Sequence, residues 1–462
     1  MLSLCAIGGT LSPLSATIYL PALNNIQEDF QITVERVNLT VTAYLILQGL
    51  SPSFWGAISD VWGRRPVYIM TITIYCGACI GLALCHHYGV LLFLRMLQAF
   101  GSSPLIAVGY ATLGDVTEPH NRAGYFGFFS LGQLLGPIIG PIIGGILAGT
   151  VGWRWIFWLL VIVSSIILIS ITLFVNETLR SAVGNGSLYA NPTPIQWVQR
   201  RKMRRKYQDD HDDEKDNKTN KPIVEKKKKS RYSQRPEFLA SFIYLSELDV
   251  LVALLYVGFF YMGYYYYLVS TTNLFASLYG LSTLQIGLCY IPQGVASILG
   301  SLFSGKLLDY NFKMVSNEYQ QNHPSDMIVE RGKVPLDFPI YYARLRYTWV
   351  FIVLAQLITI IYGWLLQIGA PLAVPIIIQF IVSFCMVALQ SGVQTLIVDL
   401  FPGKGASISA SNNLVRCLLG AIATVTVDAG ISSVGVGMFF VVNYTTKKER
   451  KKEGIINLIS CF

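Results

Sequence analysis

Long apolar runs separated by short polar stretches fill most of the chain. A helix rises about 1.5 Å per residue and the hydrocarbon core of a bilayer is about 30 Å thick, so an apolar run of roughly 18 residues or more can span a membrane. The pattern predicts six such helices before residue 178 and five after residue 247. The predicted spans are 4–23, 39–57, 67–84, 91–113, 123–147 and 153–175, followed by 251–273, 284–308, 349–368, 372–396 and 406–427.

A twelfth apolar stretch, residues 431–444, differs from the others because it is short. It would cover only about 21 Å as a helix, less than the hydrocarbon core. A basic tail, residues 445–462, follows it. The last helix is therefore expected to be short or damaged. One hypothesis is that the coding sequence departs from its ancestral frame near Gly437, which sequencing of the transcript would test.

Polar stretches divide the chain into four parts. We predict a six-helix bundle over 1–178, a basic and mostly disordered cytoplasmic linker over 179–246, a second helical bundle with five good spans and one short one over 247–444, and the basic cytoplasmic tail. The fold class is then an all-α polytopic membrane protein. The linker carries fourteen Lys or Arg against seven Asp or Glu between residues 200 and 231. Attraction to anionic lipid explains this charge without a nucleic-acid partner.

Composition agrees with a membrane protein. Of the 462 residues 53% are hydrophobic and 13% are charged, and the mean hydropathy is +0.50. So little charge cannot cover the surface of a soluble protein. The eight cysteines are scattered, and the Cys76–Cys79 pair lies inside an apolar span, which favours small buried residues over a zinc or redox site.

Basic residues favour one set of loops, as the positive-inside rule requires of cytoplasmic loops. These loops hold Arg64, Arg65 and Arg122, together with the linker and the stretch 313–346. The opposite loops are less basic and hold Glu28, Asp29, Glu35 with a lone Arg36, His86, His87, Arg154 and Asp428. Both termini are therefore predicted to be cytoplasmic.

One short hairpin carries the most specific motif. Gly56, Asp60, Gly63, Arg64 and Arg65 lie within ten residues between the second and third spans. The glycines allow a tight turn and the paired arginines indicate a cytoplasmic loop. The G-x-x-x-D spacing recurs at the end of the eighth span, at Gly305 and Asp309.

Two further motifs lie inside spans. The fourth span contains the sequence L-L-F-L-R-M-L-Q-A-F-G, with Arg95 and Gln98. In the fifth span glycines recur at every fourth residue, which makes a groove that lets another helix approach closely, and two prolines bend the helix. These residues are Gly132, Gly136, Pro137, Gly140, Pro141, Gly144 and Gly145.

Together these motifs resemble the major facilitator superfamily, and within it the fungal twelve-span drug:proton antiporters of the quinidine and multidrug-resistance branch. The resemblance implies two six-helix bundles around a central cavity. It also implies that Asp60 and Asp115 hold the arginines when the cytoplasmic gate is shut. Val61 departs from the family's loop pattern, where a basic residue is usual. The remaining gate residues implied are Gly56, Gly63, Arg64, Arg65, Glu118, Arg122, Gly305 and Asp309.

Charges inside spans are costly and usually functional. Only Arg95 and Arg416 lie well inside, and no Asp or Glu occupies the middle of a span. Arg95 and Gln98 are candidates for proton coupling, either by bringing positive charge near a bound group or as a structural anchor. Glu247 and Asp249 are alternatives for the proton site.

Aromatic and polar residues suggest a substrate cavity. Aromatic faces attract flat lipophilic cations, although about half of the aromatics in the seventh span are expected to face lipid or to serve packing. The candidates are Tyr19, Gln133, Tyr256, Tyr261, Tyr264, Gln293, Gln390, Asn412, Asn413 and Arg416.

The leading functional hypothesis is a proton-coupled antiporter that exports lipophilic or cationic small molecules by alternating access. The alternatives are an exporter of polyamines, amino acids or weak organic acids, a sugar-type importer, and a non-transporting sensor. We expect no enzymatic activity and no cofactor, since nothing resembles a P-loop and the driving force is the proton gradient. The expected partners are a small molecule, protons and the lipid bilayer, with no metal and no nucleic acid. A monomer in the plasma membrane is expected, with the vacuolar membrane as the alternative location.

Overall fold

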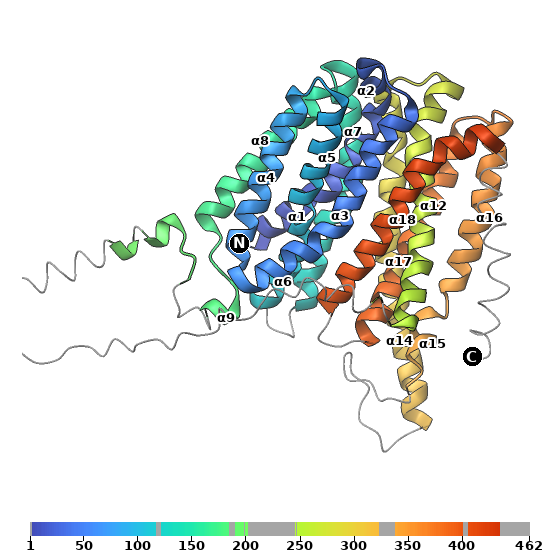
Figure 1. Cartoon of the computed structure of the whole chain (residues 1–462). Helices are drawn as coiled ribbons and strands as arrows, with labels where there is room; N and C mark the ends of the chain where they lie inside the picture. The colour runs from blue at the N-terminus through green and yellow to red at the C-terminus, as the bar shows by residue number, and fades with distance from the viewer. Residues whose placement is uncertain are drawn as a thin grey trace, which may run out of the picture.

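The protein folds as two groups of helices that lie side by side (Figure 1). The structure, a computed structural model, describes residues 2–116, 122–183, 190–197, 199–201, 245, 247–322, 338–400 and 405–434. These residues contain helices and no strand. Residues 435–462 and most of the linker lie outside the described part, as does Glu118, so the predictions of a short last helix, a basic tail and a disordered linker stay predictions.

Each of the eleven long apolar runs coincides with one helix or with successive helices, whereas most of the twelfth, 431–444, lies outside the described residues. The first bundle comprises α1 (Leu2–Thr17), η1 (Leu20–Ala22), α2 (Leu23–Phe30), α3 (Val34–Trp62), α4 (Arg64–Leu84), α5 (Tyr88–Ser102), α6 (Pro104–Val116), α7 (Arg122–Thr150), α8 (Arg154–Phe174) and the short α9 (Arg180–Val183). The second comprises α12 (Leu248–Tyr279), α13 (Thr283–Cys289), α14 (Ile291–Asn322), α15 (Ile340–Leu345), α16 (Thr348–Gln367), α17 (Ala373–Leu400) and α18 (Gly405–Val434).

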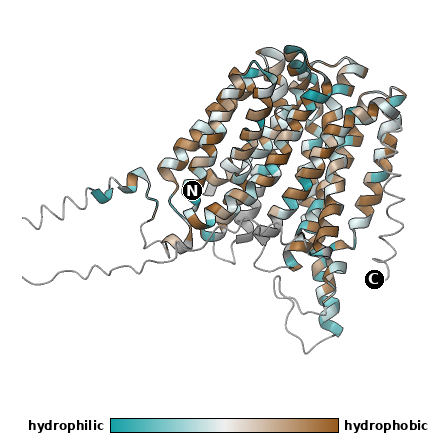
Figure 2. Ribbon diagram, viewed as in Figure 1, coloured by the Kyte–Doolittle hydropathy of each residue, from teal (hydrophilic) through white to brown (hydrophobic). Residues whose placement is uncertain are grey.

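Apolar helix surfaces face outward. Among the described residues, nine helical segments are long and apolar enough to cross a membrane. On α8 the large apolar residues Ile162, Ile166 and Ile169 are more than half exposed, and brown apolar residues line the outer helices in Figure 2. Such surfaces are stable only against lipid tails. The chain is an integral membrane protein.

The helices run between two opposite ends of the molecule. We call the end where α3 gives way to α4 the Arg64 end, and the opposite end, which carries α2, the α2 end (Figure 1). The final part of α14 extends beyond the other helices at the Arg64 end and packs Tyr319 on Phe338, with ring centroids 5.5 Å apart.

The glycine groove of α7 holds α1. A Cβ on Gly136 would come within 2.8 Å of the Leu14 nitrogen, and one on Gly144 would overlap the backbone oxygen of Ile18. Gly145 lies on another face of α7 and approaches the second bundle, where its Cβ would lie 3.0 Å from the Cα of Gly287 on α13. The repeat thus serves packing within the first bundle, and its last glycine serves the contact between bundles.

A second close contact between the bundles joins α3 to α18, which lie side by side in Figure 1. The helices are antiparallel, and paired positions run from Asn38 with Asp428 through Thr42 with Thr424 to Gly49 with Cys417. We call this contact the α3–α18 seam. From one pair to the next, the residue number rises in α3 by as much as it falls in α18. The two helices therefore keep one register from the α2 end to the middle of the molecule.

One prediction about this region was wrong. The hydropathy pattern predicts a loop at Asp428, because the apolar run stops at Val427. The helix α18 instead continues to Val434 and includes Asp428. An aspartate can sit in this last part of the helix because amide side chains of two neighbouring helices bind its carboxylate.

The groove predicts a clear difference between two glycines. Gly144→Ala should lower the free energy of unfolding by about 1–3 kcal/mol, because the new methyl group would overlap a backbone atom that cannot move aside. Gly149→Ala is the matched control, since its Cβ would meet Leu284 at an ordinary 3.6 Å. Denaturation of the purified variants in detergent measures both. Equal stability of the two variants would contradict the packing described.

Candidate functional site

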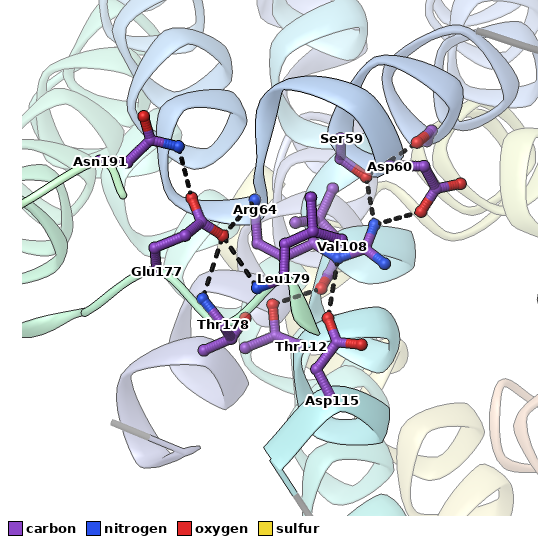
Figure 3. A network of polar contacts seen from close by, with 11 residues as sticks. Ser59, Asp60, Arg64, Val108, Thr112, Asp115, Glu177, Thr178, Leu179 and Asn191 are labelled. Carbon is purple, nitrogen blue, oxygen red and sulfur yellow. Dashed lines mark hydrogen bonds and ion pairs between the residues drawn. The ribbon is translucent and has the colours of Figure 1, made fainter. Parts of the chain in front are cut away.

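Arg64 joins two helices at the Arg64 end. Its guanidinium donates to Asp60 Oδ1 at 2.6 Å, to Ser59 Oγ at 2.6 Å and to Asp115 Oδ2 at 3.0 Å (Figure 3). Asp60 and Ser59 belong to α3, whereas Asp115 lies near the end of α6. The structure therefore brings together the three charged residues that the motif predicts for the gate.

Glu177 completes this network from the segment after α8. Its Oε1 accepts from the backbone nitrogens of Arg64, Thr178 and Leu179 at 2.8–3.1 Å, and its Oε2 accepts from Asn191 (Figure 3). A carboxylate at the start of α4 satisfies a free backbone N–H and opposes the positive end of the helix dipole. Gly63 has φ +109°, a conformation that favours glycine, and a Cβ there would overlap this carboxylate.

Arg65 differs from its expected role. Its guanidinium donates to the backbone oxygens of Asn191 at 3.1 Å, Pro192 at 2.8 Å and Thr172 at 2.8 Å. It thereby binds Asn191 and Pro192 of the predicted linker to the Arg64 end. The sequence could not show this, because the acceptors are backbone atoms more than 100 residues away.

The other predicted gate residues differ in packing and exposure. A Cβ added to Gly56 or Gly305 would meet no atom within 4 Å. Asp309 is exposed near the Arg64 end of α14. Arg122 begins α7, and its side chain lies outside the described part.

The second bundle has a corresponding ion pair that sequence reasoning missed. Arg344 on α15 donates through Nε to Asp399 Oδ2 of α17 at 2.8 Å, and it lies 4.4 Å from the ring centroid of Phe312. The Arg344 side chain is 1% exposed. The sequence pattern predicts a loop over residues 313–346, so it does not predict this pair. The G-x-x-x-D repeat at Gly305 and Asp309 is the one motif that indicates gate residues in the second bundle.

Arg95 is buried near the middle of the first bundle. It is 0% exposed, and its guanidinium carbon lies 4.0 Å and 4.5 Å from the ring centroids of Tyr19 and Tyr44. It donates to Gln98 Oε1 at 2.6 Å, while its Nε and one terminal nitrogen make no hydrogen bond with the described residues. The structure brings Arg95 together with Gln98, the other candidate for proton coupling, and with the cavity candidate Tyr19. Cation–π contacts and one amide replace the carboxylate that normally compensates a buried charge.

Arg416 lies where the bundles meet. Its guanidinium donates to Asn413 Oδ1 at 2.9 Å and lies 4.7 Å from the ring centroid of Tyr261. Asn413 donates in turn to the backbone oxygen of Gln48 on α3 at 3.0 Å. The Arg416 Nε makes no hydrogen bond with the described residues. The structure thus joins three predicted cavity residues, Tyr261, Asn413 and Arg416, to the first bundle.

Aromatic rings surround this arginine on one side. Tyr261 contacts Tyr264 and Tyr265 with ring centroids 6.2 Å and 5.0 Å apart. Tyr256 instead packs edge-on against Phe260, one turn away from this group.

The remaining cavity candidates belong to separate networks. Gln293 donates to Gln379, and Gln379 donates to Thr271 and to Tyr362, each at 2.8 Å. Asn412 donates to Gln394 within the second bundle.

Gln133 on α7 and Gln390 on α17 are partly buried, and the Gln133 Nε2 makes no hydrogen bond with the described residues. Gln379 was not predicted, because a single glutamine in an apolar run gives no distinctive signal.

No metal centre is visible in the part of the chain that the structure describes, where no three His, Cys, Asp or Glu side chains are placed to hold one ion. A surface hollow of about 390 Å³ lies at the α2 end against Asn25, Asp29, Trp153 and Arg154. The middle of the molecule, around Arg95 and Arg416, offers hydrogen-bond donors and aromatic faces. These groups can bind a small molecule, and they do not resemble a catalytic site.

Exposure separates the two acidic partners of Arg64. The Asp60 side chain is 65% exposed, whereas that of Asp115 is 18% exposed. Asp60→Asn should therefore cost about 0–1 kcal/mol of unfolding free energy, and Asp115→Asn about 1.5–3 kcal/mol. Thermal unfolding of the two variants side by side measures the difference. A larger cost for Asp60→Asn would contradict this ranking.

Comparisons with known proteins agree with this architecture. The model of the Major Facilitator Superfamily matches residues 5–424. Citrate exporter 1 of Aspergillus niger is 38% identical over 423 residues, which are 91% of this chain and 78% of that protein. The multidrug transporter QDR2 of Candida glabrata is 32% identical, covering 90% and 72% of the two chains. Quinidine resistance protein 1 of Saccharomyces cerevisiae is 31% identical, covering 90% and 75%.

Solved structures share the fold at low identity. A D-xylose-proton symporter superposes with a TM-score of 0.63 at 14% identity, covering 96% of this chain and 95% of the other. A POT family transporter in complex with 5-aminolevulinic acid gives a TM-score of 0.65 at 14% identity, covering 96% and 93%. The all-helical fold of the described residues, the ion pairs around Arg64 and the match over nearly the whole length agree: the chain belongs to the Major Facilitator Superfamily and is a membrane transporter, not an enzyme.

Proposed function

We propose that this transporter exports small organic acid anions in exchange for protons. The observation that carries the proposal is the position of Arg416 at the meeting of the two bundles, with a guanidinium Nε–H that no described residue accepts. Guanidinium groups bind carboxylates through paired hydrogen bonds. A carboxylate between the bundles would satisfy this donor.

The charge balance of the interior supports an anionic substrate. Arg95 adds a second positive charge, and its contacts are aromatic rings and an amide rather than an acid. In a low-dielectric interior an uncompensated positive charge attracts anions and repels cations over several ångströms. The name of the citrate exporter, a relative at 38% identity, points to the same class of substrate.

The direction of export rests on the orientation of the chain in the membrane. We place the Arg64 end in the cytoplasm, because it carries Arg64, Arg65 and Arg344, whereas Glu28 and Asp29 lie at the α2 end. The α2 end would then face the outside of the plasma membrane. The inward proton gradient would drive the cycle without a bound cofactor.

A second candidate function is export of lipophilic or cationic drugs, the leading hypothesis from the sequence. The aromatic group of Tyr261, Tyr264 and Tyr265 favours it, since such faces bind flat apolar cations. The names of the multidrug transporter and the quinidine resistance protein favour it as well.

The proposal predicts that Arg416→Gln reduces organic acid transport at least tenfold. Removing the guanidinium removes a charge-assisted pair with the substrate carboxylate, worth about 1.5–3 kcal/mol. The assay is pH-gradient-driven movement of radiolabelled citrate in liposomes holding the purified protein. Arg154→Gln is the matched control, because Arg154 forms a half-exposed pair with Asp29 at the α2 end. Undiminished citrate transport by Arg416→Gln would contradict the proposed role.

The two candidate functions predict opposite effects on a cation. If anions are the natural substrates, a fluorescent lipophilic cation should move slowly through the unaltered protein and faster through Arg416→Gln, since a repelling charge is lost. Rapid cation export by the unaltered protein, abolished by a protonophore and unaffected by excess citrate, would favour the drug exporter instead.

A further inference from the structure

The sequence offered Arg95 with Gln98, and Glu247 or Asp249, as candidates for proton coupling, but it placed no carboxylate in the middle of a span. Asp428 is a carboxylate that the structure places inside a helix between the bundles. It lies in α18 within the apolar segment Ala410–Ile431, and its residue is only partly exposed. It stands at the α2 end of the α3–α18 seam, so it belongs to the second bundle and faces the first. The gate carboxylates Asp60 and Asp115 lie at the opposite end of the molecule.

Two amide side chains meet the Asp428 carboxylate. Asn38 of α3 donates through Nδ2 to Oδ2 in a short contact, and Asn273 of α12 donates to Oδ1 at 3.5 Å. The other titratable groups facing this site are Glu35 of α3, whose negative charge acts on Asp428, and Tyr266 of α12, whose hydroxyl is bonded to Thr426. The carboxylate therefore has amide partners and an acidic neighbour.

Asn38 has an unused hydrogen-bond acceptor at this site. The residue is 1% exposed, and its Oδ1 makes no hydrogen bond with the described residues, although its Nδ2 is bonded to Asp428. A buried carbonyl oxygen without a donor is costly. An ionised carboxylate offers only acceptors and cannot satisfy it. A protonated carboxyl group has one O–H, and that O–H can donate to Asn38 Oδ1.

We propose that Asp428 binds the coupling proton and that the protonated acid closes the α3–α18 seam by pairing with Asn38. The acid and the amide are complementary: the amide N–H donates to one carboxyl oxygen while the carboxyl O–H donates to the amide oxygen. The only chemical change is a proton transfer, in which a hydronium on the α2 side gives its proton to one carboxylate oxygen. This inference rests on the proposed proton exchange and names its site.

The sign of the effect fits an antiporter. When the α2 end is open, Asp428 meets the outer medium and takes up a proton. The neutral acid then favours the closed seam, which returns the transporter to the state that is open to the cytoplasm. Asp428 releases its proton into the cavity of that state, toward the cytoplasm, before the seam opens again. The Thr42–Thr424 hydroxyl pair, with oxygens 2.6 Å apart, lies one turn deeper along the same seam and gives it a further polar contact.

The test measures seam closure separately from transport. Nitroxide labels at His87→Cys and Ile368→Cys, both exposed at the α2 end, report the separation of the bundles. The seven cysteines in the described residues are buried, so labelling favours the introduced sites. Lowering the pH from about 8 to about 5 should shift the protein toward the short distance. In Asp428→Asn the distance should stay short at every pH, because the new amide can pair with Asn38 in the same way.

Matched variants distinguish this site from general acid effects. Glu35→Gln removes the exposed neighbouring carboxylate and should keep the pH response. Asn38→Leu removes the partner and should lose the response, leaving the longer distance populated at low pH. Retention of the unaltered protein's pH response by Asp428→Asn would overturn the assignment.

Transport gives the second readout. Asp428→Asn should lose both proton-driven substrate transport and exchange of labelled for unlabelled substrate at least tenfold, because its seam stays closed at every pH. If the unaltered protein shows no proton-driven transport, the proposed function fails, and the distance measurement still decides whether Asp428 controls the seam. Full proton-driven transport by Asp428→Asn would overturn the inference alone.

Discussion

Close antiparallel approach of helices from the two bundles is the constraint on which the rest of the structure depends. Within a bilayer every backbone polar group must be bonded inside its own helix, so the bundles can move only as packed units. Nothing hydrophobic drives them together in lipid, and contact requires small residues and complementary polar pairs. Gly145 against Gly287 and Gly49 against Cys417 provide the small residues, while Thr42 with Thr424 provides a polar pair.

The contacts between the two bundles also explain why the interior can hold charged side chains. Arg95 and Arg416 are shielded from lipid by the bundles, and aromatic rings and amides bind them in place of acids. Positive charge held in this way is expensive unless something of opposite charge visits it. An anion that binds between the bundles would meet this requirement during each cycle, which links the energetics of the interior to the proposed substrate.

Sequence patterns predicted the fold well because membrane helices have a strong signal. Each of the eleven long apolar runs corresponds to described helices, and the motifs around Arg64, Arg95 and Gly132 indicated the family. The pairing of Arg64 with Asp60 and Asp115 also followed from a motif. These features depend on local composition or on fixed spacing, which the sequence displays directly.

Contacts between distant segments were beyond such reasoning. The Arg344–Asp399 pair joins residues 55 positions apart, one of them in a stretch that resembles a loop. Asp428 was assigned to a loop because the hydropathy pattern shows the end of an apolar run and not the end of a helix. Its pairing with Asn38 depends on the register of α3 against α18, and no single element encodes that register.

Calorimetric titration of the purified protein with citrate and, separately, with a lipophilic cation tests the claim of an anionic substrate most directly. The account predicts saturable citrate binding that weakens as salt concentration rises, because charge-assisted contacts are screened. Saturable binding of the cation, with no heat from citrate and no competition between the two, would contradict it.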